Sequence, residues 1–243
     1  DHPKLHPRCN EAEIELLAQG RGDFMPVKEP PRRFPLKAAC QSGNLWLLNG
    51  YQFLTNIGWA FLILTLSDYL RDVIKLDPTK ASLITSTVLF IGIAALPAGG
   101  LLADVFARRF GLRLGRVLLL SSTRFMAAGC YLLALTVDAS NPWLMAVFFG
   151  AVAFSADLAL PATWATMQDI SGKYQAQLFG WSNMWGNFGA AIQPILFAYV
   201  LRAFDVNHDY REGIFLCAGV FALAGIVALG INAQKAVIKE SSV

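Results

Sequence analysis

Charged residues are scarce in this sequence: they make up 15% of its 243 residues, whereas 55% are hydrophobic and the mean hydropathy is +0.46. That charge content is too low for a soluble domain of this size. The charges also crowd into residues 1–43 and a few short loops, and the stretches between them are as apolar as bilayer-spanning segments must be. The composition therefore predicts a polytopic, all-α transmembrane protein.

Histidine and cysteine are also few. The three histidines lie in the leading segment or in a loop, so no metal cluster and no Ser-His pair forms at a consistent depth. The cysteines contain no CxxC pair, which argues against a zinc site or a disulfide framework: Cys9, Cys40, Cys130 and Cys217. We expect that the protein is not an enzyme and holds no metal or other cofactor.

No signal peptide is visible in the sequence either. Residues 1–43 are polar and basic, with no apolar core before the first span, and the chain begins at Asp1. We interpret 1–43 as a cytoplasmic linker in which Asn10 caps a short helix, and we expect an upstream part of the protein to be missing. The net charge of +3 reflects topology rather than a nucleic-acid partner, because membrane proteins carry Lys and Arg in cytoplasmic loops.

Six apolar segments follow, each close to the roughly 20 residues that one bilayer crossing needs. They lie at 45–66, 82–103, 117–137, 143–166, 177–201 and 214–231, and short polar turns separate them, among them 104–116. We expect a six-helix transmembrane domain over 44–231 and a cytoplasmic tail at 232–243. The loops and termini on one side of the membrane hold 14 Lys and Arg, and the loops on the other side hold 5. The richer set includes both termini, so we expect both termini in the cytoplasm. The protein is expected to be a multi-pass protein of the cell membrane.

Polar residues form a stripe along the first span. Asn49, Gln52, Asn56 and Trp59 recur every three or four residues, and Tyr51 lies beside them. Amides that face lipid would be costly, so this face must point to protein or to water.

Two amides share a face of the fifth span. Asn183 and Asn187 are four residues apart, which places them one above the other on a helix. They can line a wet cavity and hydrogen bond a carboxylate or hydroxyl group of a substrate. They can equally join two helices, since Gly180, Gly186 and Gly189 allow close packing there.

Arg124 and Asp157 are the charged residues expected within the hydrocarbon, in the third and fourth spans, about 12–15 Å from the cytoplasmic end. Ionisable residues at such depth are candidates for function, Asp157 as a proton site and Arg124 as an anion site. A mutually neutralising structural pair explains them at least as well. Pro161, four residues after Asp157, frees a backbone carbonyl and can kink the helix for gating.

The turn after the second span has the pattern G-G-x-x-x-D-x-x-x-R-R-x-G, from Gly99 to Gly111. Gly100 lets two helices approach, and Asp104 beside Arg108 and Arg109 can form a charge latch at the membrane face. An ordinary positive-inside loop explains the arginines but not the spacing of the glycines and the aspartate.

This turn resembles the loop that major facilitator transporters carry between the second and third helices of each half, although Val105 stands where that family usually has a basic residue. Residues 157–173 and 180–194 resemble helices ten and eleven of the family's anion:cation symporter branch, which imports sugar acids and other organic anions, and residues 6–13 resemble that branch's central loop. The resemblance implies the C-terminal six-helix half of a twelve-helix fold. It implies that the substrate site includes Tyr51, Gln52, Asn56, Thr163, Trp164, Asn183 and Asn187.

The same resemblance implies a latch at the cytoplasmic face. Asp169 ends the fourth span and is expected to pair with Arg108, Arg109 or Arg116 when the transporter faces outward. We therefore expect transport of a small organic anion by alternating access. The resemblance implies that a proton is the coupling ion and that a missing N-terminal half forms the opposite wall of the substrate site. The alternative is a non-transporting sensor or scaffold, in which Gln52, Asn56, Asn183 and Asn187 pack against one another with no cavity.

Overall fold

The computed structural model describes residues 10–13, 15, 34–204 and 209–238, and no β-strand occurs within these ranges. The chain divides into Asp1–Phe34 and Pro35–Val243, which we describe separately. In the first part, Glu13 N donates to Asn10 Oδ1 over 2.8 Å and Asn10 N donates to Glu13 Oε2 over 3.1 Å. This reciprocal cap at the start of a helical turn is the one predicted for Asn10.

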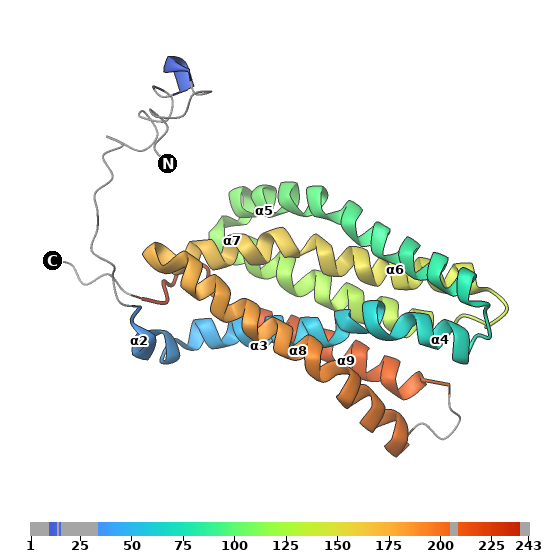
Figure 1. The fold of residues 1–243 in the computed structure, drawn as a ribbon. Helices are drawn as coiled ribbons and strands as arrows, with labels where there is room; N and C mark the ends of the chain where they lie inside the picture. The colour runs from blue at the N-terminus through green and yellow to red at the C-terminus, as the bar shows by residue number, and fades with distance from the viewer. Residues whose placement is uncertain (1–9, 14, 16–33, 205–208, 239–243) are drawn as a thin grey trace. The chain divides into compact units, whose positions relative to one another are not determined.

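Pro35–Val243 is a helical bundle (Figure 1). In chain order its elements are α2 (Leu36–Cys40), α3 (Gly43–Ala60), the π-helix η2 (Phe61–Thr65), α4 (Leu66–Asp72), α5 (Pro78–Ala134), α6 (Pro142–Leu158), α7 (Leu160–Ser171), the 3-10 helix η3 (Gly172–Tyr174), α8 (Gln175–Phe204) and α9 (Arg211–Leu229).

Four helical stretches in the described ranges are long and apolar enough to cross a membrane: Gly43–Asp72, Pro78–Ala134, Pro142–Phe204 and Arg211–Leu229. The second and third have 57 and 63 residues, about three times the length of one crossing. Each turns back once, so that α5 consists of two arms that run in opposite directions and α8 returns beside α7 (Figure 1). The fold is therefore the predicted six-helix transmembrane bundle.

Both reversals occur at a glycine with positive φ. Gly111 has φ 78° and ψ 165°, and Gly172 has φ 53°, conformations that side chains with a Cβ rarely adopt. The sequence predicted a polar turn over all of 104–116, which is wrong in extent. Because one glycine makes the whole reversal, helix continues on both sides of it. We call the end of the bundle that holds these two turns the Gly111 end.

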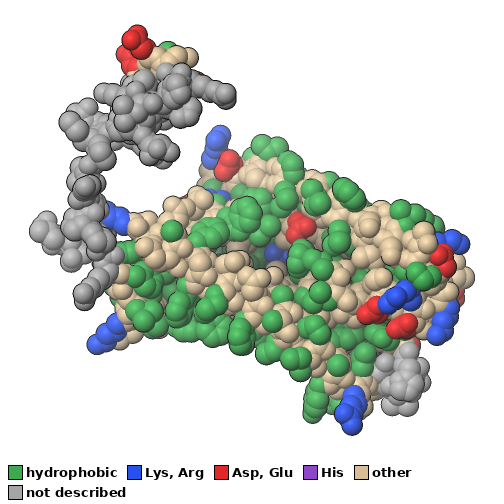
Figure 2. Space-filling view, in the orientation of Figure 1, with side chains coloured by type: hydrophobic (Ala, Val, Ile, Leu, Met, Phe, Trp, Pro, Cys, Tyr) green, Lys and Arg blue, Asp and Glu red, His purple; other side chains and the backbone are tan. Residues whose placement is uncertain are grey.

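Apolar side chains are spread along the face of the bundle seen in Figure 2, and Lys, Arg, Asp and Glu gather at its two ends, apart from a small acidic and a small basic patch midway along that face. Inside, α5 packs most extensively on α6, and α3 packs on α8 and α9. The ring of Phe61 lies 5.5–5.8 Å from those of Tyr131, Phe149 and Phe197. This aromatic core joins η2, which continues directly from α3, to α5, α6 and α8 and holds the walls of the site in place.

Candidate functional site

A cavity of about 130 Å³ lies among α3, the second arm of α5, α6 and α7. Its wall is made by Tyr51, Gln52, Thr55, Asn56 and Trp59 of α3, Arg124 of α5, Ala156 and Asp157 of α6, and Leu160 and Thr163 of α7. Complete ligand pockets usually measure about 300–1,000 Å³. The cavity is therefore the size of part of a ligand site. Gln52, Asn56 and Trp59 of the predicted stripe line it, whereas Asn49 is buried and accepts a hydrogen bond from Ser182 of α8.

Arg124 is the largest buried side chain of this wall, with 2% of its surface exposed. Its Nε donates to Tyr51 Oη over 2.9 Å and its NH2 donates to the backbone oxygen of Ala156 over 3.0 Å. The guanidinium carbon lies 5.2 Å from the centre of the Tyr51 ring and 5.5 Å from that of Phe221. The third nitrogen, NH1, has no partner in the described part of the chain. Arg124 therefore lines the cavity and keeps one buried nitrogen without a hydrogen-bond acceptor among the described residues.

Asp157 lies across the same cavity in a notch made by a glycine of α5. A Cβ added at Gly92 would lie 2.4 Å from Asp157 Oδ2, so the carboxylate fills the space that a side chain would need. Trp59 lies with Asp157 in the wall of the same cavity. No ion pair joins Asp157 to Arg124, because the ion pairs among the described residues are Arg71–Asp68 and Arg116–Asp169. The two charges share a cavity without the mutually neutralising contact that the sequence favoured.

Gln52, Asn56 and Thr163 complete the polar part of the wall. Asn56 Nδ2 donates to the backbone oxygen of Gln52 over 2.8 Å, and Thr163 Oγ1 donates to that of Ala159 over 2.9 Å. The Gln52 amide makes no hydrogen bond to the residues that the structure describes. The wall therefore offers amide and hydroxyl oxygens beside one cationic donor, a combination that suits a polyhydroxy acid.

Three residues expected at the substrate site lie away from the cavity. Trp164 is 48% exposed and its ring packs against Phe179, with 6.4 Å between ring centres. One residue along a helix turns a side chain by about 100°, so Thr163 faces the cavity and Trp164 does not. Asn183 and Asn187 are exposed on α8, and Asn187 Nδ2 donates to the backbone oxygen of Asn183 over 2.8 Å.

Some wall residues were not among the predicted site residues. Trp59 belongs to the predicted polar stripe, which was a usable signal, but Thr55 and Leu160 carry no such pattern. Gly92 contributes only the absence of a side chain, and nothing in the local sequence distinguishes it from other glycines of the span. In the described ranges, no three His, Cys, Asp or Glu side chains come together as a metal site would require.

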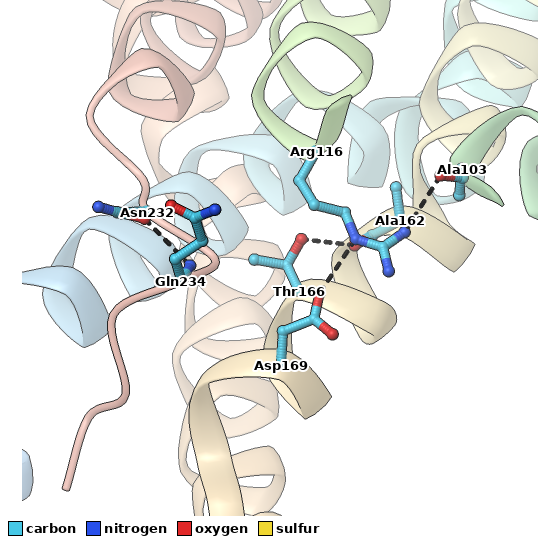
Figure 3. A network of polar contacts seen from close by, with 7 residues as sticks. All are labelled: Ala103, Arg116, Ala162, Thr166, Asp169, Asn232 and Gln234. Carbon is cyan, nitrogen blue, oxygen red and sulfur yellow. Dashed lines mark hydrogen bonds and ion pairs between the residues drawn. The ribbon is translucent and has the colours of Figure 1, made fainter. Parts of the chain in front are cut away.

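At the Gly111 end, Asp169 of α7 pairs with Arg116 of α5 (Figure 3). Arg116 Nε lies 3.1 Å from Asp169 Oδ2, with the two side chains 8% and 22% exposed, and Arg116 NH1 donates to the backbone oxygen of Ala103 over 3.4 Å. Of the three arginines predicted as partners, the structure selects Arg116. This pair joins both arms of α5 to the end of α7.

The other predicted latch residues are exposed. Asp104 and Arg108 form no ion pair within the described chain, and Arg109 stacks on Phe110 at 5.8 Å. A Cβ added at Gly100 would touch nothing within 4 Å, whereas one at Gly99 would lie 2.3 Å from the backbone oxygen of Leu158. Close approach of α5 to the α6–α7 junction therefore depends on Gly99.

Residues 231–238, most of which were predicted as tail, cross the Gly111 end as a strap. Asn44 Nδ2 donates to the backbone oxygens of Asn232 and Lys235 over 2.9 and 3.0 Å, and Asn232 N donates to Asn44 Oδ1 over 2.8 Å. Val237 N donates to the backbone oxygen of Ile170 over 2.9 Å. The strap ties the start of α3 to the end of α7, one residue after Asp169.

Comparison with known proteins gives a consistent result. The family model described as Major Facilitator Superfamily matches residues 48–241. The chain is 25% identical over 237 residues to the probable galactarate/D-glucarate transporter of Bacillus subtilis (strain 168), covering 93% of this chain and 50% of that protein. It is 25% identical over 248 residues to vesicular glutamate transporter 1 of Bos taurus, covering 96% and 42%. The chain spans about half the length, or less, of these curated relatives.

Proposed function

This chain belongs to the major facilitator superfamily, and from that premise we propose that it is one half of a secondary transporter that moves a small organic anion together with protons. A second six-helix half supplies the opposite wall of the substrate site, and the two halves rock about it. The names of the two relatives, one for sugar diacids and one for glutamate, support a carboxylate as the substrate class.

The observation that carries this proposal is the unpartnered NH1 of Arg124. A guanidinium that is 2% exposed and leaves one nitrogen without an acceptor incurs a desolvation penalty. A substrate carboxylate at NH1 removes that penalty with a charge-assisted hydrogen bond. Gln52, Asn56 and Thr163 then face the hydroxyl groups of the same ligand.

A non-transporting scaffold is less well supported. It requires the amides of the first and fifth spans to pack against one another and fill the interior. Gln52 and Asn56 instead border open space, and Asn183 and Asn187 are exposed on a different helix.

We further propose that the Gly111 end faces the cytoplasm of a cell membrane. The strap and the Asp169–Arg116 pair lie at that end, and of the described Lys and Arg seven lie there and five at the other end, the bias that the positive-inside rule favours. The Asp169–Arg116 pair then closes the cytoplasmic side when the site opens outward.

Uptake into proteoliposomes tests the proposal. The full-length protein is reconstituted, and entry of labelled D-glucarate is followed with a proton gradient imposed or collapsed, with galactarate and L-glutamate as competitors. Arg124→Gln should weaken uptake affinity by about 10- to 100-fold, the equivalent of one charged hydrogen bond. Arg202→Gln, at an exposed arginine near the end of α8, is the matched control and should leave uptake unchanged. The absence of gradient-driven accumulation of any of these carboxylates, or full affinity in Arg124→Gln, would rule the proposal out.

A further inference from the structure

We infer that Asp157 carries the proton that accompanies an anion to Arg124, so that this half of the protein contains a coupling site of its own. The inference rests on the proposed function, because it concerns how the same cavity handles charge. Its basis is the charge balance of the cavity. The wall contains buried Arg124 and the carboxylate of Asp157, and these two residues form no ion pair with each other.

The two charges are held apart by their own partners. Tyr51 Oη and the backbone oxygen of Ala156 fix two nitrogens of Arg124. The carboxylate of Asp157 lies in the space left by the missing side chain of Gly92. Each charge therefore keeps its position when the cavity is empty, and NH1 is not drawn onto Asp157.

With both groups ionised, the empty cavity is neutral. An anion that binds NH1 brings a negative charge into the field of the Asp157 carboxylate, in a cavity of only about 130 Å³. An uncompensated buried charge of this kind is costly in a membrane interior. One proton on Asp157 restores neutrality. Anion and proton therefore bind with positive linkage, and by reciprocity the anion favours protonated Asp157 as much as the proton favours the anion.

The step balances without any further reactant. A proton from the outer solution adds to a carboxylate oxygen of Asp157 and gives the carboxylic acid, and the anion binds NH1. On the inner side the anion leaves, the carboxylic acid loses its proton to solution, and the site returns to its starting charge. Anion and proton cross in the same direction.

No other group at the cavity can take this role. Besides Arg124 and Asp157, the titratable side chain in its wall is Tyr51, whose oxygen already accepts from Arg124. The first arm of α5 presents Gly92 to Asp157, α3 presents Trp59 and α7 presents Thr163, none of which titrates in the physiological range. Gly92 is then a positioning residue, because any side chain there displaces the carboxylate.

The test measures binding of L-glutamate, which carries one net negative charge near neutral pH as the charge balance requires, to the full-length protein in nanodiscs from mildly acidic to mildly alkaline pH, together with its uptake in proteoliposomes. Wild-type affinity should fall by about tenfold for each unit of rising pH, as expected for one linked proton. Asp157→Asn, which is neutral at every pH, should bind with pH-independent affinity. It should lose gradient-driven accumulation but keep exchange of labelled for unlabelled substrate.

Two glycine variants cover the case in which Asp157→Asn does not exchange substrate at all. Gly92→Ala keeps the carboxyl group but displaces it, so the pH profile of binding should shift while exchange persists. Gly129→Ala is the control, because a Cβ there would meet nothing within 4 Å. The coupling site would be overturned, and the proposed function left standing, if Asp157→Asn kept both the wild-type pH dependence of affinity and gradient-driven accumulation. An unshifted pH profile of binding in Gly92→Ala would have the same consequence. A wild-type protein that binds none of the carboxylates would overturn the proposed function along with it.

Discussion

Replacing Gly99 by Ala, with Gly100→Ala as its matched control, tests how α5 approaches the α6–α7 junction. A Cβ at position 99 would lie 2.3 Å from the backbone oxygen of Leu158, and ordinary van der Waals contact begins at 3.4 Å. The first arm of α5 must therefore move by about 1 Å. At position 100 the same methyl group meets nothing within 4 Å. The two variants share a helix, a neighbourhood and a chemical change, and differ only in this contact.

The magnitude follows from two opposing terms. Overpacking costs about 1–3 kcal/mol, because the obstacle is backbone and cannot swing aside. Exchanging Gly for Ala within a helix gains about 0.5–1 kcal/mol in both variants. Gly100→Ala should therefore be slightly more stable than wild type, and Gly99→Ala should be less stable than Gly100→Ala by about 1–3 kcal/mol. For a chain of this size that difference corresponds to roughly 2–12 °C in the unfolding midpoint.

Thermal unfolding of the detergent-solubilised full-length protein, followed by intrinsic tryptophan fluorescence at one scan rate, measures this difference. Uptake in proteoliposomes provides a second readout, since a displaced α5 also carries Gly92 away from Asp157. Equal midpoints for the two variants, or a Gly99→Ala protein more stable than Gly100→Ala, would refute the claim that Gly99 sets the distance between these helices.

Three further outcomes follow from the contacts at the Gly111 end and in the core. Asp169→Asn should raise labelling of a cysteine introduced between the cavity and the Gly111 end, because the ion pair with Arg116 is lost. Asp104→Asn, at an exposed carboxylate that forms no ion pair with the described residues, should not, and equal effects would contradict the assignment. Asn44→Ala removes three hydrogen bonds to the strap and should speed proteolysis within 232–238. An unchanged cleavage rate would show that these hydrogen bonds do not hold the strap in place. Tyr131→Phe should lower the unfolding midpoint, at a cost of about 1–2 kcal/mol, because its hydroxyl donates to the buried Gly58 oxygen over 2.7 Å; an unaltered midpoint would show that this bond does not contribute.

The sequence was sufficient for the crossings and for one wall of the cavity. Apolar length sets the number of crossings, and the cost of exposing an amide to lipid forces the stripe with Gln52 and Asn56 to face inward. Both arguments depend on the bilayer as a solvent, which acts on every residue regardless of its neighbours. For that reason they could be made without knowing the packing.

Rotamers and close contacts could not be predicted in the same way. Arg124 and Asp157 lie at similar depths, so pairing was the simplest expectation, but Tyr51 and the Ala156 carbonyl compete for the guanidinium. The choice of Arg116 over two other arginines as the partner of Asp169 depends on which arm of α5 lies beside α7. Such outcomes follow from differences of a few kcal/mol among neighbours distant in sequence, which spacing along the chain does not encode.

The cavity and the latch share one rigid element. α7 begins at Leu160, immediately after α6 ends, and the break falls between Asp157 on α6 and Thr163 on α7. Pro161 occupies the first turn of α7, where its missing N–H weakens the connection to α6. Thr163 and Asp169 are six residues apart on α7, about 9 Å along its axis. A tilt of α7 about this break therefore moves Thr163 relative to Arg124 and separates Asp169 from Arg116 in one motion. If the proposed transport mechanism holds, we expect occupancy of the cavity and closure of the Gly111 end to be coupled through this single helix, with no need for a longer chain of contacts between them.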